Sequence, residues 1–290
     1  MSRRLLVASS TAAAALAFTS FAPPFRVGAN PVTCAASDPK AEDTENLRMW
    51  TGRWKNNNTR WHSTRPHASL IKHLDVLPEG PTLVPLCGKT VDLHYLASTQ
   101  RPAVGVEGVK KAIEEYSSEQ APHGVSFDAF KDTGEYSAME TYAGSYEGVP
   151  VKILRGDFFD LQGSFAGAWD RAAFVAIRPE MRDEYAKVLG RTIEPGGVIL
   201  MSTYERRAGT PEAVVDGPPF SVSEADVRST FGSLDWVESI ELLEDVDVFT
   251  EPRYKDSVKR WSDAGLTDFR EIVLVIRVKG GNKKAWWKFW

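Results

Sequence analysis

Short apolar runs alternate with amphipathic stretches along most of the chain. The apolar runs predict buried strands at 82–85, 103–107, 151–154, 167–174, 198–203, 236–248 and 269–278. The stretches with helical spacing predict helices at 66–77, 91–98, 110–120 and 179–192, and Ser223 is the expected N-cap of another. Because strands and helices alternate, we expect an α/β fold with a mostly parallel sheet.

One part of the chain departs from this alternation. Residues 121–150 contain Gly134, Gly144 and Gly148 and have little periodicity. We therefore expect an irregular segment, followed by a turn at Glu147-Gly148 that leads into the strand at 151–154.

The most informative segment is Thr82–Thr90, which reads TLVPLCGKT. It predicts a buried strand that breaks at Pro85 and Gly88 and then enters a helix. The next predicted strand ends in Glu107. Glycine lets the backbone approach a ligand, and an acid on the neighbouring strand can accept two hydrogen bonds from ribose hydroxyls. The pair predicts a site for a nucleoside-bearing cofactor.

A phosphate-binding P-loop is the first alternative, because Gly88-Lys89-Thr90 resembles the end of that motif. The motif needs a glycine where this chain has Leu83. We therefore expect a cofactor that carries a ribose but no phosphate chain, and S-adenosylmethionine is the obvious candidate.

Composition narrows the class of protein. The chain has 290 residues, 42% of them hydrophobic, which suits one globular domain with tails. Its net charge is −4 although the first 40 residues are basic, and such an acidic body argues against a nucleic-acid binder. Cys34 and Cys87 are the two cysteines, so a disulfide framework is not expected. The histidines show no metal-ligand spacing, and no metal is implied.

Residues 1–40 have the pattern of a targeting leader. Arg3-Arg4 precedes an apolar run from Leu5 to Ala17 that is too short for a membrane span. Residues 26–40 resemble a transit peptide, and Ser20–Pro23 resembles the cleavage region of bipartite plastid leaders. We expect plastid import; secretion, mitochondrial import and twin-arginine export are the alternatives.

The C-terminal tail, 280–290, begins with a glycine pair that should stop the last strand, and it contains lysines with Trp286, Trp287 and Trp290. Such a tail suits contact with a membrane interface or a partner. We favour the simpler interpretation, a short extension whose aromatic side chains pack on the domain.

Several motifs occur in an order that resembles the thiopurine S-methyltransferase family of class I S-adenosylmethionine-dependent methyltransferases. They are Trp50-x-x-x-Trp54, Trp61-His62, Pro85-Leu86-Cys87-Gly88-Lys89, Gly105-Val106-Glu107, Phe159-Asp160-Leu161, Trp169-Asp170-Arg171-Ala172 and Gly217-Pro218-Pro219-Phe220. The resemblance covers about Trp50 to Lys279, so we assign a methyltransferase domain to 41–279. It implies a single Rossmann-like domain, with helices on both faces of a seven-stranded sheet whose last strand is antiparallel, and a monomer.

The resemblance also implies a set of site residues. Cofactor contacts fall on Trp50, Trp54, Leu86, Gly88, Glu107, Asp157, Phe158 and Arg171; acceptor contacts fall on Trp61, His62, Pro219 and Phe220; Arg171 and Asp170 lie at the reaction centre. Glu107 would bind the ribose, the backbone at 86–88 would pass the methionine portion, and Asp157 with Phe158 would frame the adenine.

Simpler roles stand beside these assignments. Asp170 and Arg171 would then form only a structural ion pair. Trp50 and Trp54 would only form the core of a lid, and Glu107 would only cap a helix. Two departures from the family matter: Trp61 stands where many relatives have Phe, and the stretch after Phe127 does not match.

The implied reaction is in-line transfer of the sulfonium methyl group to a small thiol bound as its thiolate. Arg171 would lower the pKa of that thiol, which is ordinarily about 8.5. Two other classes of methyl acceptor fit the same chemistry: halide, thiocyanate or hydrosulfide ions, and thioethers. A binding protein without turnover is the alternative of another class. Nucleic acid and protein are the least favoured acceptors, since the body is acidic and no Asn/Asp-Pro-Pro-Tyr motif occurs.

Overall fold

The computed structural model describes residues 45–125, 127–131, 136 and 139–280. The leader predicted at 1–40 lies outside the described residues, and so does the tail beyond Gly280. The targeting signal, the role of the tail and the monomeric state stay predictions. No helix within the described ranges is long and apolar enough to cross a membrane.

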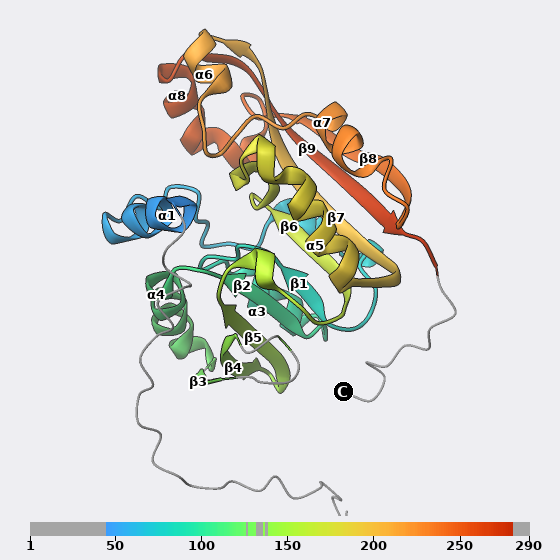
Figure 1. The fold of residues 1–290 in the computed structure, drawn as a ribbon. Helices are drawn as coiled ribbons and strands as arrows, with labels where there is room; N and C mark the ends of the chain where they lie inside the picture. Colours follow the sequence, from blue (N-terminus) through green and yellow to red (C-terminus); the bar gives the residue numbers. More distant parts are fainter. Residues whose placement is uncertain (1–44, 126, 132–135, 137–138, 281–290) are drawn as a thin grey trace, which may run out of the picture. The chain divides into compact units, whose positions relative to one another are not determined.

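The described residues form one mixed sheet with the strand order β3-β4-β5-β2-β1-β6-β7-β9-β8 (Figure 1). Its strands are β1 (Thr82–Val84), β2 (Ala103–Glu107), β3 (Asp128–Lys131), β4 (Glu140–Tyr146), β5 (Val149–Arg155), β6 (Phe165–Arg171), β7 (Ile193–Gly209), β8 (Val237–Asp247) and β9 (Leu266–Val278). The five strands from β5 to β7 are parallel, whereas β9 is antiparallel to both β7 and β8. The Rossmann-like α/β fold with an antiparallel last strand is confirmed.

The number of strands differs from the seven expected, because the segment predicted to be irregular contains a β-hairpin. β4 pairs with β5 in the antiparallel direction, and β3 pairs with β4 at the edge of the sheet. Tyr146 lies opposite Val149, and both Glu147 and Gly148 between them have positive φ, which is the geometry of a two-residue hairpin turn. The small residues Ala143-Gly144-Ser145 hide the alternation that would have predicted β4.

The predicted helices lie close to their expected positions, and the described residues also contain helices at 211–215 and 255–263 that were not predicted. The helices are α1 (Glu45–Lys55), α2 (Ala68–Lys72), α3 (Asp92–Ser98), α4 (Lys110–Gln120), α5 (Arg182–Thr192), α6 (Pro211–Val215), α7 (Glu224–Phe231) and α8 (Lys255–Asp263). The helix predicted over 66–77 is shorter: His67 caps α2, and a separate 3-10 turn follows at Leu74–Val76. Ser223 caps α7 as predicted, in a reciprocal capping box with Asp226.

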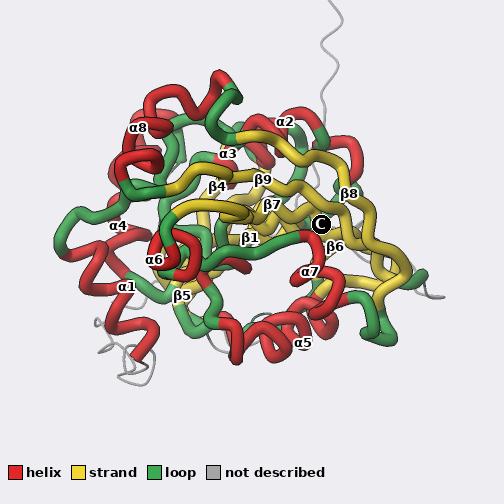
Figure 2. The backbone as a smooth tube through the Cα atoms, turned by 90° about the horizontal axis from the view of Figure 1, so that it is seen from above, coloured by secondary structure: helices red, strands yellow, loops and turns green. Residues whose placement is uncertain are grey.

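The core has two layers, one on each face of the sheet. Neighbouring strand residues point to opposite faces, so Leu83 packs in one cluster and Val84 in the other. The first cluster includes side chains from α5 and α7, and the second includes side chains from α2, α3 and α4. Figure 2 shows α2 and α3 on one side of the strands and α5 on the other. Helices on both faces are confirmed.

Candidate active site

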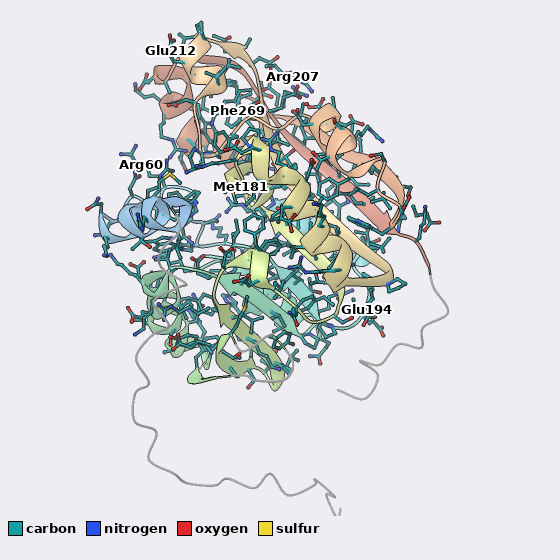
Figure 3. The ribbon with its side chains drawn as sticks, viewed as in Figure 1. Arg60, Met181, Glu194, Arg207, Glu212 and Phe269 are labelled. Atoms are coloured by element: carbon teal, nitrogen blue, oxygen red, sulfur yellow. The ribbon has the colours of Figure 1, made fainter. Side chains whose placement is uncertain are left out.

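A cavity of about 800 Å³ lies at the carboxyl ends of the parallel strands. Strand order reverses between β1 and β6. From β1, the sheet continues through β2 and β5 in one direction and through β6 and β7 in the other. Ligands of open α/β sheets bind at such a switch point. Arg60, Met181 and Phe269, which line the cavity, come from three distant parts of the chain (Figure 3).

The turn after β1 forms one wall. Leu86 and Gly88 both have positive φ, at 43° and 55°, so the chain reverses sharply. The Cys87 N–H donates to the Val106 carbonyl at 2.9 Å, which ties the turn to β2. A Cβ on Gly88 would lie 3.3 Å from the Trp54 ring. Glycine therefore lets α1 approach this turn closely.

Glu107 ends β2 at the same wall and is 7% exposed. One carboxylate oxygen accepts from the Gly88 N–H at 2.9 Å and the other from the Val109 N–H at 2.7 Å. Burial raises the pKa of Glu107 to about 7, although backbone hydrogen bonds oppose the rise. Each oxygen still has a lone pair free for a hydroxyl donor. The helix-cap role and the ribose role are therefore compatible.

Asp157 and Phe158 follow β5 and also line the cavity. The Asp157 side chain accepts from the Phe159 N–H at 3.0 Å, and burial raises its pKa. Phe158 is buried and stacks on Tyr185 with ring centroids 4.7 Å apart. Both residues lie where a planar ring could pack, but contact with adenine stays a prediction.

Three tryptophans cover the cavity from the side of α1. The rings of Trp50 and Trp54 lie 5.4 Å and 6.1 Å from that of Trp61, each edge to face. Trp54 is 3% exposed and packs with Val109 and Ala112 at the start of α4. All three tryptophans line the cavity while packing on one another. This arrangement is compatible with both a lid and a binding wall, and the two roles stay predictions.

Asp170 and Arg171 end β6 and point to opposite faces of the sheet. The Asp170 carboxylate accepts from the Tyr185 hydroxyl at 2.6 Å and from the Phe174 N–H at 3.1 Å. It is fully buried, burial raises its pKa to about 6, and it does not line the cavity. The interactions of the described residues include no ion pair between Asp170 and Arg171. The geometry favours a structural role for Asp170.

Arg171 lines the cavity and donates to the Trp61 carbonyl at 3.0 Å, while its buried Nε has no hydrogen-bond partner. Burial alone would lower the pKa of Arg171. The acidic groups of Tyr204 and Asp92 outweigh burial and raise that pKa above its ordinary value. The guanidinium is therefore a permanent positive charge beside the cavity.

The residues predicted for the acceptor fall into two groups. Trp61, His62 and Pro219 line the cavity, and burial lowers the pKa of His62. Phe220 does not line it: its N–H donates to the Val175 carbonyl at 2.6 Å. Phe220 therefore holds the loop in place rather than forming the wall.

Sequence reasoning missed a polar group at the end of the cavity opposite Glu107. Its members are His67, Asp92, Tyr204, Arg253, Tyr254 and the carboxylate of Glu271. The one available signal was Glu271, an acid inside an otherwise apolar strand. No spacing linked it to the others, which lie far away along the chain.

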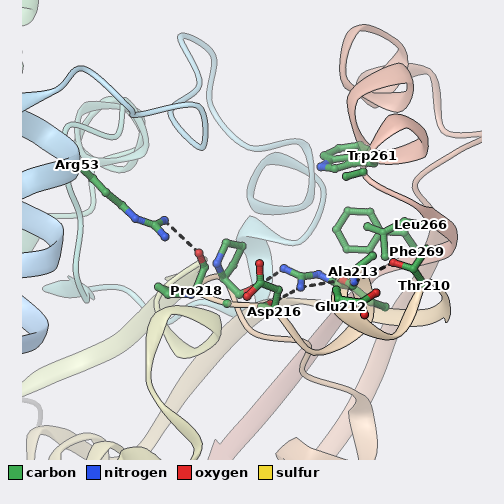
Figure 4. Close-up of a pocket in the computed structure, with 13 residues that line it drawn as sticks. Arg53, Thr210, Glu212, Ala213, Asp216, Pro218, Trp261, Leu266 and Phe269 are labelled. Atoms are coloured by element: carbon green, nitrogen blue, oxygen red, sulfur yellow. Dashed lines mark hydrogen bonds between the residues drawn. The ribbon is translucent and has the colours of Figure 1, made fainter.

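A second cavity of about 360 Å³ shares Pro219, Trp261 and Phe269 with the first (Figure 4). The Arg206 guanidinium donates to the backbone carbonyls of Ala213, Asp216 and Pro219, and so fixes the loop that contains Gly217–Phe220. Arg53 of α1 donates to the Pro218 carbonyl at 3.0 Å from the other side (Figure 4). This loop is thus fastened to α1.

Within the described parts of the chain, no cluster of three or more His, Cys, Asp or Glu side chains is suited to hold a metal ion. The sheet order and the cavity at the strand ends are those of a Rossmann-like α/β domain with a ligand site at its switch point.

The family model for Thiopurine S-methyltransferase (TPMT) matches residues 45–270, and the chain belongs to this family. It is 33% identical over 223 residues to "Thiopurine S-methyltransferase" of Pseudomonas entomophila, which covers 73% of this chain and 95% of the relative. It is 34% identical over 220 residues to "Probable thiopurine S-methyltransferase" of Danio rerio, with coverage of 73% and 89%. The protein is an S-adenosylmethionine-dependent S-methyltransferase.

Solved structures agree on the fold. The 1,6-didemethyltoxoflavin-N1-methyltransferase of Burkholderia thailandensis, solved with S-adenosylhomocysteine, matches with a TM-score of 0.50 and 17% identity, covering 86% of this chain and 94% of that one.

Proposed function

We propose that the protein methylates a small thiol that is bound as its thiolate beside Arg171. The observation that carries this proposal is the buried, charged guanidinium at the cavity wall, which has an unpartnered Nε and no carboxylate in an ion pair. An anion completes such a group by accepting charge-assisted hydrogen bonds, and a thiolate is one such anion. Thiopurines, after which the relatives are named, would be drug-like substrates of the same pocket.

The residues on the opposite side fit S-adenosylmethionine. Glu107 keeps lone pairs for two ribose hydroxyls, and the glycine at 88 leaves room beside the turn. The backbone of 86–88 would pass the methionine portion, while Asp157 and Phe158 would frame the adenine. The cofactor supplies an electrophilic methyl group on a positively charged sulfur.

Arg171 would promote the reaction by ionising the acceptor. A free thiol has a pKa of about 8.5, and an arginine in contact can lower it by roughly a unit or more. The thiol proton passes to solvent, and the thiolate sulfur then attacks the methyl carbon. No general base is required at this stage.

The tryptophans of α1 and Trp61 would exclude water and steady the sulfonium charge on their ring faces. Alignment of donor and acceptor in this closed site supplies the remaining rate enhancement.

Methylation of halide, thiocyanate or hydrosulfide ions is the second candidate. It is favoured by Trp61, whose ring packs edge to face on both Trp50 and Trp54 and reduces the space for a bulky acceptor. Thioethers form a third class of acceptor with the same donor chemistry.

The test is methyl transfer from labelled S-adenosylmethionine by residues 41–290 to a panel of thiols, hydrosulfide, iodide, thiocyanate and thioethers. We expect turnover of organic thiols, and a loss of about 10- to 100-fold in kcat/KM on Arg171→Lys. Preference for iodide or thiocyanate would replace the thiol proposal. Cofactor binding without turnover of any compound would contradict it.

We also propose that residues 1–40 direct the protein to a plastid. The support is the basic start, the short apolar run and the Ser20–Pro23 segment. Fusion of residues 1–44 to a fluorescent protein tests this in a cell with secondary plastids. Plastid fluorescence is expected, and secretion or mitochondrial fluorescence would select one of the alternatives.

A further inference from the structure

Glu271 is a fully buried carboxylate in the middle of β9. Its neighbours in the strand, Ile272, Val273 and Leu274, are apolar and buried. A buried carboxylate is costly unless it is paired and hydrogen-bonded. Glu271 therefore requires partners that pair with it and donate hydrogen bonds to it.

Four polar groups from three parts of the chain converge on Glu271. One oxygen accepts from the Ser202 hydroxyl at 2.7 Å and lies 3.2 Å from His67 Nε2. The other accepts from the Arg253 guanidinium at 2.8 Å and from the Tyr254 hydroxyl at 2.5 Å. Three of these partners, His67, Arg253 and Tyr254, line the main cavity, whereas Glu271 does not.

His67 is fixed as a neutral donor. Its Nδ1 accepts from the Ser69 N–H at 3.3 Å, so the proton resides on Nε2, the atom that faces Glu271. Burial, and then the charges of Arg171 and Arg253, hold the pKa of His67 well below its ordinary value. With both ring nitrogens engaged, His67 does not serve as the base for an acceptor.

A directed chain of hydrogen bonds runs from Glu271 toward Arg171. Tyr254 donates its proton to Glu271, so at the 3.3 Å contact its oxygen accepts from the Tyr204 hydroxyl. Tyr204 lines the cavity together with Arg171, whose positive charge opposes the rise that burial causes in the pKa of Tyr204. Both hydroxyl protons, those of Tyr204 and Tyr254, therefore point toward Glu271.

These hydrogen bonds lie at the half of the cavity that the proposed function assigns to the methyl acceptor. Arg171 and Tyr204 come from β6 and β7, and Arg253 with Tyr254 precedes α8. Glu107 and Asp157, by contrast, follow β2 and β5 on the other side of the switch point.

We propose that Glu271 is a positioning residue of the methyl-acceptor subsite: it orients Arg253 and Tyr254 directly, and Arg171 through the two tyrosines. The proposal rests on the proposed function, because it takes Arg171 to be the group that meets the acceptor. Glu271 itself touches neither acceptor nor cofactor.

The sharpest test is the pH profile of kcat/KM for a thiol with Glu271→Gln. Through space, loss of a negative charge would lower the apparent pKa of the bound thiol. Loss of arginine alignment would raise it. The acceptor limb is the part of this profile in which kcat/KM rises as the thiol ionises. We expect the acceptor limb to move to higher pH and kcat/KM at neutral pH to fall about 10-fold or more. The calorimetric affinity for S-adenosylmethionine should not change.

Glu244→Gln is the matched control. Glu244 lies on β8, is also 3.9 Å from the Arg253 guanidinium, and pairs with His73 at 2.6 Å, but it does not line the cavity. Its variant should keep the wild-type profile. Tyr254→Phe is the second variant. It removes the hydroxyl that links Tyr204 to Glu271 and leaves the carboxylate in place. Its acceptor limb should also move to higher pH, but by less than that of Glu271→Gln.

The outcomes separate this proposal from the proposed function. An acceptor limb in Glu271→Gln that stays in place or moves to lower pH would overturn the positioning role, as would an unshifted limb in Tyr254→Phe if Glu271→Gln does not fold. A wild type that methylates ions but no thiol would overturn the proposed function instead. The Glu271 role would then be tested by kcat/KM for the preferred ion, which the positioning role requires to fall.

Discussion

Gly88 and Glu107 are joined by a hydrogen bond of 2.9 Å, from the backbone N–H of the turn after β1 to the carboxylate that ends β2. The same carboxylate accepts from Val109 at the start of α4. One buried acid therefore fixes two of the loops that surround the cavity. Its orientation is set before any ligand binds, and this preorganisation reduces the entropy lost on binding.

Substitution of Glu107 should weaken cofactor binding. In Glu107→Gln the side-chain amide would present a donor to at least one N–H that now faces an oxygen. We expect cofactor affinity to fall by about 1–3 kcal/mol, the usual cost of lost charge-assisted hydrogen bonds. Titration calorimetry measures this. Glu114→Gln, which changes an exposed acid of α4, is the control, and equal affinities for the two variants would reject the ribose assignment.

Cofactor affinity should also depend on pH through Glu107. Its pKa is raised to about 7, and ribose hydroxyls donate to the ionised form. Binding should therefore strengthen as pH rises through about 7. Below about pH 7, binding should release the proton of the Glu107 carboxyl group. The free protein has the opposite trend: the raised pKa gives stability at low pH that is lost between about 4.5 and 7. Calorimetry from pH 5.5 to 8.5 would reveal a flat affinity if this account is wrong.

The residues predicted for the cofactor side line one cavity together, because they are local in the sequence. Gly88 and Glu107 end adjacent strands, and each strand was visible as a short apolar run. The side that faces Arg171 could not be predicted in this way. His67, which caps α2, lies 3.2 Å from Glu271 of β9 although the two are far apart in the sequence, and no short-range pattern encodes such a contact.

Strand geometry alone separates Asp170 from Arg171. Adjacent residues of a strand point to opposite faces, so only one of the two can face the cavity. The family motif treats them as a unit and does not show the difference. The hairpin of β3 and β4 was missed for another reason, since Ala143, Gly144 and Ser145 carry no hydrophobic signal.

Asp170→Ala should reduce stability rather than catalysis. It would leave the Tyr185 hydroxyl and the Phe174 N–H buried without an acceptor. We expect the free energy of unfolding to fall by about 2–3 kcal/mol. Denaturant titration measures this, and Asp170→Asn, which keeps an acceptor, should lose less. A normal unfolding curve with kcat reduced about 100-fold or more would restore the catalytic assignment.

Gly88→Ala should disturb the contact between the cofactor turn and α1. Its φ of 55° disfavours any side chain, and the new Cβ would lie 3.3 Å from Trp54. We expect a loss of about 1–2 kcal/mol in stability from the backbone alone, together with weaker cofactor binding. Gly52→Ala is the control, because nothing lies within 4 Å of its Cβ and alanine favours a helix by about 0.5–1 kcal/mol. Equal melting temperatures for the two variants would contradict the prediction.

Arg53 fastens α1 to the loop that carries Pro219. Its guanidinium donates to the Pro218 carbonyl at 3.0 Å and lies 5.0 Å from the centroid of the Trp50 ring. Arg206 holds the same loop from the other side, so loss of Arg53 should free α1 without unfolding the loop. We expect Arg53→Ala to release the cofactor about 3- to 10-fold faster, since one charge-assisted hydrogen bond contributes about 1 kcal/mol. Stopped-flow tryptophan fluorescence measures this rate, and Lys55→Ala, on an exposed position of the same helix, should leave it unchanged. If both variants release the cofactor at the wild-type rate, the hydrogen bond from Arg53 to Pro218 does not hold α1 in place.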